Sequence, residues 1–218
     1  MATREAQRIS LQPEDIVLGR DVGRETFGAA AQPPVFFAAG AEIYAQGERS
    51  GNLYKVEFGA VRTYRLLADG RRQIAAFHLP GEVFGFEADM THHFFADAIC
   101  ATGIRVLRAS QAADTMAGEL LPMALKSLGR AHEHLMLLGC QSAVERIAAF
   151  LIDMSERQGD LQQVELPMSR ADIGDYLGLT IETVSRVFSK LKQKGIIRLP
   201  GLRSVEIVRW QALQDMVA

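Results

Sequence analysis

The chain has 218 residues, of which 48% are hydrophobic and 23% charged, and its formal net charge at pH 7 is −2. This composition is that of an ordinary soluble globular protein, long enough for one large domain or two modest ones. No run of apolar residues reaches the length that a membrane span needs, and the first ten residues lack the apolar core of a secretory signal. Cys100 and Cys140 have no C-x-x-C spacing, which argues against a disulfide framework or a zinc site and favours a reducing, cytoplasmic location.

An irregular N-terminal segment, residues 1–30, with a short possible helix near 12–18, precedes a region of period-two patterning at 31–115. Tyr54, Val56 and Phe58 alternate there with Leu53, Lys55 and Glu57, and glycines recur between the apolar runs. The stretch LADGRRQ contains an Asp-Gly pair, a strong hairpin signal. Short strands with turns at this spacing predict an antiparallel roll or sandwich.

The period changes to that of a helix over residues 116–157. Apolar and small residues recur there at alternating steps of three and four, the seam of a coiled coil. The seam consists of Leu121, Ala124, Leu128, Ala131, Leu135 and Leu138, and the same spacing continues to Ser142. A second stripe, on another face, consists of Met136, Cys140, Val144, Ile147 and Leu151. A helix that is apolar on two faces needs two partners, so we predict that the seam joins two copies of the chain; the alternative is that both stripes pack within one subunit.

The C-terminal part, residues 165–218, has the pattern of a winged helix-turn-helix. Ser169 followed three residues later by Asp172 resembles a capping box at the start of a first helix. Gly178 follows at the turn, and a second helix runs from Thr180 or Ile181 to about residue 194. The sequence IIRLPGLRSVEIV then predicts a hairpin, the wing. The residues expected to form the buried face are Ile173, Leu177, Val184, Phe188 and Leu191.

Positive charge gathers on this C-terminal part although the whole chain is slightly acidic. Between residues 180 and 203 six basic side chains accompany a single acid, Glu182. Charge concentrated on one segment points to a polyanionic partner; the alternative is a solvated, salt-bridged helix face.

The second helix has residue types suited to reading DNA bases. If its first turns enter a major groove, the side chains that face the bases are Ile181, Glu182, Ser185 and Arg186. Arginine pairs with guanine, glutamate accepts from cytosine N4, and an aliphatic group contacts a thymine methyl. Glu182 and Arg186 can also pair with each other. The residues expected to hold phosphates are Arg170, Thr180, Thr183 and Lys190.

The order of roll, long helix and winged helix-turn-helix resembles the CRP/FNR family of bacterial transcription regulators, most closely its FixK type. The local likeness covers GNLYKVEFGAVRTYR and GRRQIAAFHLPGEVFG in the roll, SAVERIAAFLIDMSER in the long helix, and SRADIGDYLGLTIETVSRVFSKLKQKGII near the C-terminus. The resemblance implies an α+β fold: an N-terminal antiparallel β-roll like a cyclic-nucleotide-binding domain, a long dimerisation helix, and a C-terminal winged helix-turn-helix.

The resemblance also implies a homodimer that binds a TTGA-N6-TCAA-like palindrome in double-stranded DNA and activates transcription. Glu182, Ser185 and Arg186 occupy the family's three base-reading positions. Contact with RNA polymerase is expected from surface loops of the roll, with Glu87 and Asp89 as candidates. The FixK type controls genes for low-oxygen respiration and nitrogen fixation.

The sequence departs from the ligand-binding patterns of the family. Members that bind cyclic AMP have a Gly-Glu pair and an Arg-Ser pair in the roll, whereas this chain has Gly85–Phe86 and Phe95–Ala96. Oxygen-sensing members hold an iron–sulfur cluster on N-terminal cysteines, but residues 1–30 contain none, and two distant cysteines cannot supply four ligands. The histidines are more typical of satisfied core or surface residues than of haem ligands. We therefore expect no cyclic nucleotide, no metal and no cofactor.

The resulting hypothesis is an effector-independent, DNA-binding transcription activator. The alternative is an effector-dependent regulator whose roll binds an unidentified small molecule. Nothing in the sequence supports an enzyme, since neither G-x-S-x-G, a P-loop nor a metal-ligand spacing occurs. A pure interaction module would not need the wing or the basic segment.

Overall fold

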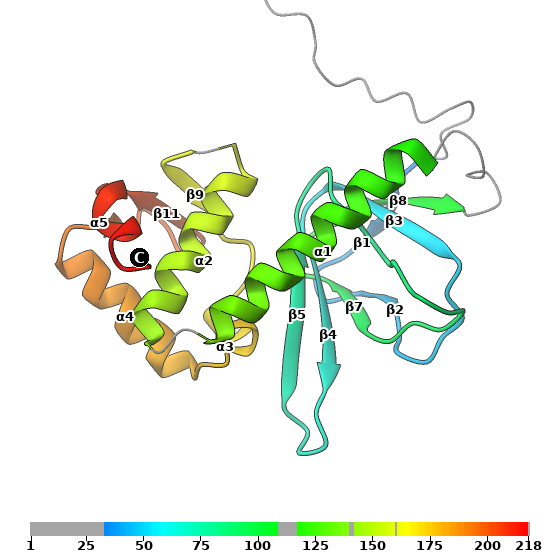
Figure 1. Ribbon diagram of the computed structural model, residues 1–218, viewed down its shortest axis with the longest axis horizontal. Coiled ribbons are helices and arrows are strands. Elements are labelled where there is room, and N and C mark those ends of the chain that lie inside the picture. Colours follow the sequence, from blue (N-terminus) through cyan, green and yellow to red (C-terminus); the bar gives the residue numbers. More distant parts are fainter. Residues whose placement is uncertain (1–32, 109–116, 140–141, 160, 218) are drawn as a thin grey trace, which may run out of the picture. The chain divides into compact units, whose positions relative to one another are not determined.

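Two four-stranded antiparallel sheets form the β-roll (Figure 1). The strand order is β1-β8-β3-β6 in one sheet and β2-β7-β4-β5 in the other. The strands are β1 (Val35–Phe37), β2 (Glu42–Tyr44), β3 (Asn52–Phe58), β4 (Val61–Leu66), β5 (Arg72–His78), β6 (Val83–Phe84), β7 (Phe95–Ala98) and β8 (Thr102–Arg108). This computed structural model describes residues 33–108, 117–139, 142–159 and 161–217, which belong to one compact unit, Gln32–Ala218. The predicted helix near 12–18 lies outside these ranges.

The β4–β5 hairpin is the one that the Asp-Gly pair predicts. The backbone N–H of Leu67 donates to the carbonyl of Arg71 across the loop at 2.8 Å. The strands then pair in antiparallel register from Leu66↔Arg72 to Val61↔His78, with a bulge near Thr63. Both strands of the hairpin carry side chains that reach the C-terminal domain.

The alternation in β3 holds for Val56 but not for Phe58. Val56 is fully buried, whereas Phe58 is 47% exposed. The register against β8 shifts between these two residues, and a bulge adds a residue that turns the following side chain toward the other face. Phe58 instead packs over Gly103 of the neighbouring strand, where an added Cβ would lie 2.2 Å from its ring.

The helical region 116–157 is two helices rather than the continuous one that the sequence predicts: α1 (Ala117–Gly139) and α2 (Ala143–Arg157). Ser142 is the N-cap of α2, and its hydroxyl accepts a hydrogen bond from the backbone N–H of Glu145 while the Glu145 carboxylate accepts from the Ser142 N–H. This capping box starts a new helix. The second apolar stripe, expected on one helix, is therefore divided between two helices. Ile147 and Leu151 of α2 are fully buried, whereas Met136 of α1 is 76% exposed. Cys140 lies outside the described residues.

The C-terminal domain has the predicted winged helix-turn-helix with two additions. The predicted parts are α3 (Arg170–Leu177), α4 (Ile181–Gln193), β10 (Ile197–Arg198) and β11 (Ser204–Ile207). The additions are β9 (Gln163–Glu165), which pairs with β11 to make the wing a three-stranded sheet, and the short helix α5 (Trp210–Gln214).

The larger hydrophobic core is shared between the roll and the helices that follow it. Phe77 of β5, Phe150 of α2 and Tyr176 of α3 belong to this core, with ring centroids 5.0 to 6.3 Å apart. A smaller core around Val56 and Ile104 lies inside the roll. The α+β fold class predicted from the sequence is confirmed. None of the described helices is long and apolar enough to cross a membrane.

Candidate DNA interface

A tight turn sets the geometry between α3 and α4. Gly178 ends α3 in the left-handed conformation, with φ at 65°, which glycine adopts without strain. A Cβ added to Gly174 would lie only 2.6 Å from the carbonyl oxygen of Leu179, so α3 and the turn approach more closely than a larger residue allows. The two glycines therefore fix how α4 leaves α3.

The two helices pack through the apolar positions that the sequence predicts. Ile173, Leu177, Val184, Phe188 and Leu191 are at most 2% exposed. The opposite face of α4 is exposed and includes Glu182, Ser185, Arg186 and Lys190, with Ile181 46% exposed at the start of the helix. The four predicted base-reading side chains thus lie on the first two turns of one solvent-facing surface.

The charged pair on α4 is arranged differently from the pair that its spacing predicts. Arg186 donates through Nη2 to the hydroxyl of Thr183 at 3.2 Å, and within the described residues it makes no ion pair with Glu182. Hydrogen bonds from its own backbone N–H and with the Thr180 hydroxyl, and to a smaller degree the charge of Arg186, lower the pKa of Glu182. Glu182 is therefore an ionised acceptor near neutral pH, at a helix N-terminus that favours negative charge.

Thr180 and Thr183 make hydrogen bonds within the helix. Thr180 is the N-cap of α4, and its hydroxyl accepts from the Thr183 backbone N–H at 3.3 Å. The two hydroxyl oxygens are 3.2 Å apart. Both groups therefore stabilise the first turn of α4, and Thr183 also holds Arg186, a role that the sequence alone does not indicate.

Arg170 lies at the start of α3 with its guanidinium 3.4 Å from the centroid of the Phe188 ring. Burial lowers its pKa to about 10, so the group remains a cation at neutral pH. A cation over an aromatic face is attracted by the ring's quadrupole, and this contact joins α3 to α4. Arg170 is only half-exposed and contributes to the helix packing as well as to the positive charge of this surface.

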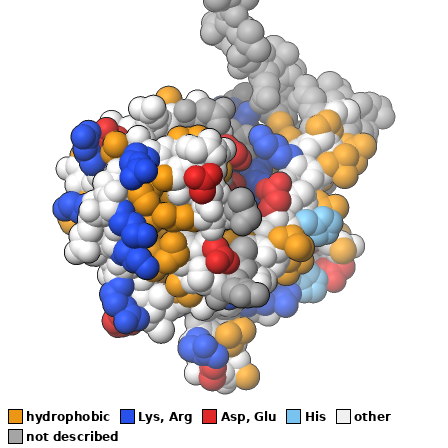
Figure 2. All heavy atoms as spheres, turned by 60° about the vertical axis from the view of Figure 1, so that its left-hand side comes forward, with side chains coloured by type: hydrophobic (Ala, Val, Ile, Leu, Met, Phe, Trp, Pro, Cys, Tyr) orange, Lys and Arg blue, Asp and Glu red, His pale blue; other side chains and the backbone are white. Residues whose placement is uncertain are grey.

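The basic side chains behind the predicted base-reading positions are exposed. Lys190, Lys192 and Lys194 lie near the C-terminus of α4, where the helix dipole favours cations. Figure 2, which brings this side of the molecule forward, shows a row of Lys and Arg side chains next to a strip of hydrophobic ones. This surface combines cations with exposed apolar groups, as a surface that contacts nucleic acid does.

The two acids predicted to contact polymerase differ in accessibility. Glu87 lies in the loop after β6, and its carboxylate accepts from the backbone N–H of His93 at 3.1 Å and lies 3.3 Å from Nδ1 of the buried His92. Asp89 has a side chain that is 58% exposed, although it also contacts His93. Of the two, Asp89 is the one that the loop presents to solvent.

The predicted seam residues lie on α1 with different exposures. Leu121, Leu128 and Leu135 are 61%, 52% and 65% exposed, and Ala131 is also exposed. Ala124 and Leu138 are half-buried. The sequence pattern missed Leu125, which is 58% exposed on the same helix. A row of exposed leucines on one helix leaves a large apolar area in contact with water, which is typical of an interaction surface.

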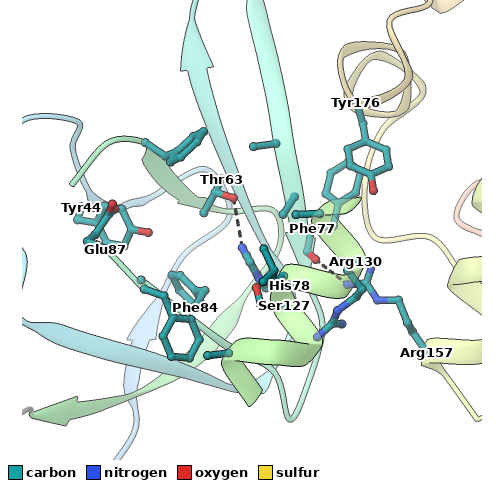
Figure 3. A pocket seen from close by; sticks show the side chains of 18 residues that line it. Tyr44, Thr63, Phe77, His78, Phe84, Glu87, Ser127, Arg130, Arg157 and Tyr176 are labelled. Atoms are coloured by element: carbon teal, nitrogen blue, oxygen red, sulfur yellow. Dashed lines mark hydrogen bonds between the residues drawn. The ribbon is translucent and has the colours of Figure 1, made fainter. Parts of the chain in front are cut away.

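A cavity of about 370 Å³ lies between the roll and α1 (Figure 3). Its wall includes His78, which burial makes neutral by lowering its pKa to about 3, and whose Nε2 lies 3.2 Å from the Thr63 hydroxyl. Arg130 and Arg157 also line it, and both pair with the carboxylate of Glu82. Among the described residues, no group of three or more His, Cys, Asp or Glu could hold a metal ion.

The sequence did not reveal a set of contacts that joins the roll to α3. Arg62 and Arg72 of the β4–β5 hairpin pair with Asp172 and Asp175 of α3. These partners are at least 100 residues apart in the chain, so neither spacing nor periodicity connects them.

Two family models match the two halves of the chain: "Cyclic nucleotide-binding domain" over residues 34–113 and "Crp-like helix-turn-helix domain" over residues 145–216. The nitrogen fixation regulation protein FixK of Rhizobium meliloti (strain 1021) is 53% identical over 180 residues, which are 83% of this chain and 85% of that protein. The protein of the same name from Azorhizobium caulinodans is 42% identical over 199 residues, 86% of this chain and 80% of that protein.

The solved structures show the same likeness in three dimensions. FixK2 from Bradyrhizobium japonicum superposes with a TM-score of 0.79 at 42% identity, covering 85% of this chain and 96% of that one. The roll, the helices and the wing described above are therefore those of a known regulator fold. The chain belongs to the CRP/FNR family of transcription regulators, with FixK proteins among its relatives and a helix-turn-helix DNA-binding domain near its C-terminus.

Proposed function

We propose that the chain is a homodimeric, sequence-specific transcription activator that binds a TTGA-N6-TCAA-like palindrome without a bound effector. The observation that carries the proposal is the exposed face of α4, where Glu182, Ser185 and Arg186 share the first two turns and Lys190 follows. An ionised glutamate is costly next to phosphates unless it accepts a hydrogen bond from a base, and the low pKa of Glu182 keeps it ionised. The names of the relatives support nitrogen-fixation genes as the regulated set. Genes for low-oxygen respiration belong to the proposal through the FixK resemblance alone.

Each side chain has a role in this proposal. Arg186 donates to a guanine, its rotamer supported by Thr183 in the free protein, and Glu182 accepts from a cytosine N4. Ser185 and Ile181 contact the neighbouring base edges. Lys190 and Arg170 hold the phosphates. Thr180 and Thr183 also contact phosphates, because a hydroxyl that accepts a hydrogen bond within the helix can still donate one to a phosphate oxygen. Asp89, with Glu87 behind it, is the proposed contact with RNA polymerase.

Arg186→Ala is expected to weaken binding to the palindrome by about 1–3 kcal/mol and to relax the preference at one base pair. Lys190→Ala is expected to weaken binding to the palindrome and to a scrambled duplex nearly alike and to lower the salt dependence. Gel-shift titrations of both variants on both duplexes measure this. Equal losses on both duplexes for both variants would show that Arg186 does not read a base.

Leu135→Lys is expected to convert the protein from dimer to monomer. The dimer would lose two buried leucines, each contributing about 1.5–3 kcal/mol, so its dissociation constant should rise at least about 100-fold. Lysine is a good helix former, so α1 itself should persist. Sedimentation equilibrium measures the change.

Leu66→Lys is the matched control, because Leu66 has a similar exposure, 55%, but lies on β4 rather than on α1. That variant should stay dimeric. If Leu135→Lys remained as dimeric as Leu66→Lys, the seam on α1 would not be the dimer contact.

The second candidate is a regulator that needs a small molecule in the roll, and the cavity of about 370 Å³ is the observation that favours it. Its two lining arginines, however, are already paired: both contact Glu82, and Arg157 also pairs with Asp153, so two carboxylates balance the two guanidinium charges and the wall offers no free positive charge for a phosphate. This pairing supports the proposal that no cyclic nucleotide binds. The two candidates differ in whether protein freed of small molecules binds the palindrome selectively.

A further inference from the structure

Four charged side chains connect the roll to α3, and we name them the joint cluster: Arg62, Arg72, Asp172 and Asp175. Arg62 Nη1 lies 3.0 Å from Asp172 Oδ1, and Arg72 Nη2 lies 2.6 Å from the same oxygen. Arg72 also donates to Asp175 Oδ2 through Nε at 3.0 Å and Nη2 at 2.8 Å. Arg62 also pairs with Asp97 of β7 at 3.1 Å, so each arginine joins two carboxylates, and Asp172 joins two arginines.

The joint cluster is shielded from solvent, unlike an ordinary surface ion pair. The side chains of Asp172 and Arg62 are 5% and 17% exposed, and those of Arg72 and Asp175 are 24% and 33% exposed. The ring of Tyr64 lies under both guanidiniums, at 5.9 Å from Arg62 and 5.6 Å from Arg72. Surface pairs contribute little, but networks with fixed, partly buried geometry hold their members in one arrangement.

Asp172 has a second role that makes the cluster specific to the orientation of α3. It is the third residue of α3, and its Oδ2 accepts from the backbone N–H and the hydroxyl of Ser169 at 3.0 and 2.7 Å. Burial raises the pKa of Asp172, but the hydrogen bonds from Ser169 and the charges of Arg62 and Arg72 outweigh it, so the pKa is lowered. The carboxylate that begins α3 is therefore also the one that attaches α3 to the roll.

An uncharged hydrogen bond also connects the roll to α3, next to the joint cluster. Gln73, next to Arg72 on β5, donates through Nε2 to the backbone carbonyl of Asp175 at 2.8 Å. Since α3 is locked to α4 by the close turn at Gly174 and by Arg170 over Phe188, whatever fixes α3 also fixes the base-reading helix.

We propose that the joint cluster orients the helix-turn-helix on the roll, so that α4 is presented for DNA binding without a small molecule. Arg72 and Asp175 are accordingly positioning residues: they touch no base and act through α3. The inference rests on the proposed function, because it explains how effector-independent binding is achieved. It goes beyond it by naming the side chains that take the place of an effector.

The test compares Arg72→Gln, Asp175→Asn and the double variant of the full chain, without additives, on the palindrome and on a scrambled duplex. Both substitutions are close in shape, and Asp175→Asn leaves the pairs of Asp172 with both arginines and its cap intact. Each variant should bind the palindrome about tenfold more weakly, and the double variant no more weakly than the worse single one. Arg71→Gln is the matched control, because Arg71 is the neighbour of Arg72 but pairs with Asp69 at the exposed tip of the hairpin.

The signs of the removed charges distinguish an orienting role of the joint cluster from simple electrostatic attraction to DNA. Arg72→Gln removes a positive charge and Asp175→Asn a negative one, so long-range attraction alone would weaken the first and strengthen the second. If both variants bind the palindrome more weakly and have unfolding midpoints close to that of the parent, the orienting role of the joint cluster is supported. Tighter binding by both, opposite effects, or behaviour like that of Arg71→Gln would each overturn it.

Arg186→Ala in the same series separates the two proposals. If Arg186→Ala weakens palindrome binding while Arg72→Gln and Asp175→Asn do not, only the proposed role of the joint cluster is wrong. If Arg186→Ala has no selective effect, the proposed base-reading itself fails.

Discussion

Replacement of Phe150 by alanine is expected to lower the free energy of unfolding by about 3–5 kcal/mol. Phe150 is fully buried in α2, with its ring 6.3 Å from that of Phe77 in the roll and 5.9 Å from that of Tyr176 in α3. The cost is large because alanine loses the transfer free energy of the ring and leaves a cavity that three different elements would have to fill. Urea denaturation of the purified chain measures the change.

Phe36→Ala is the control for that experiment. Phe36 lies on β1 and is 64% exposed, so its removal should change the free energy of unfolding by no more than about 0.5 kcal/mol. A cost below about 1 kcal/mol for Phe150→Ala, or equal costs for the two variants, would show that the core is not shared between the roll and the C-terminal helices.

Glu82→Gln is expected to cost about 3–5 kcal/mol at neutral pH, because it breaks a buried ionic contact on one side only. Glu82 Oε2 lies 2.9 Å from Arg157, whose side chain is 8% exposed, and its other oxygen pairs with Arg130. The variant leaves two guanidiniums facing a neutral amide, and among the described residues only Arg157 keeps another carboxylate partner, Asp153. The free energy of unfolding, compared with that of Glu206→Gln in the exposed pair with Arg198, measures the effect, and the control should change by less than about 1 kcal/mol.

The effect of Glu82→Gln should also depend on pH. Burial raises the pKa of Glu82. The charges of Arg157 and Arg130 and the hydrogen bond from Leu79 lower that pKa by more than burial raises it, so in the folded chain it lies below its usual value. The stabilisation is therefore fully present above the unfolded pKa of about 4.3 and is lost as pH falls through the folded pKa. Parent and variant should converge in acid; a difference that grew as pH fell would contradict this assignment.

Local patterns in the sequence predict most of the C-terminal domain. Ser169 with Asp172, Gly178 at the turn, and the apolar spacing from Ile173 to Leu191 specify two helices and their packing, and the structure confirms each of them. These signals succeed because a helix-turn-helix is made of contacts between residues that are close in sequence.

The parts that the sequence did not predict depend on distant contacts or on small competing effects. The break before α2 arises because the Ser142–Glu145 capping box competes with the continuing heptad, and a cap outweighs one seam position. The strand β9 exists because it pairs with β11, some 40 residues later. The joint cluster unites the hairpin with α3, and charge pairing across such a distance leaves no periodic signal.

The central claim, selective binding without an effector, is tested most directly by a gel-shift titration of the full chain, freed of small molecules, on a TTGA-N6-TCAA duplex and a scrambled duplex at two salt concentrations. The proposal predicts tight binding to the palindrome, a much weaker and steeply salt-dependent affinity for the scrambled sequence, and the same result before and after removal of small molecules. Binding that is weak and equal on both duplexes would contradict it and would favour the regulator that needs a ligand in its roll.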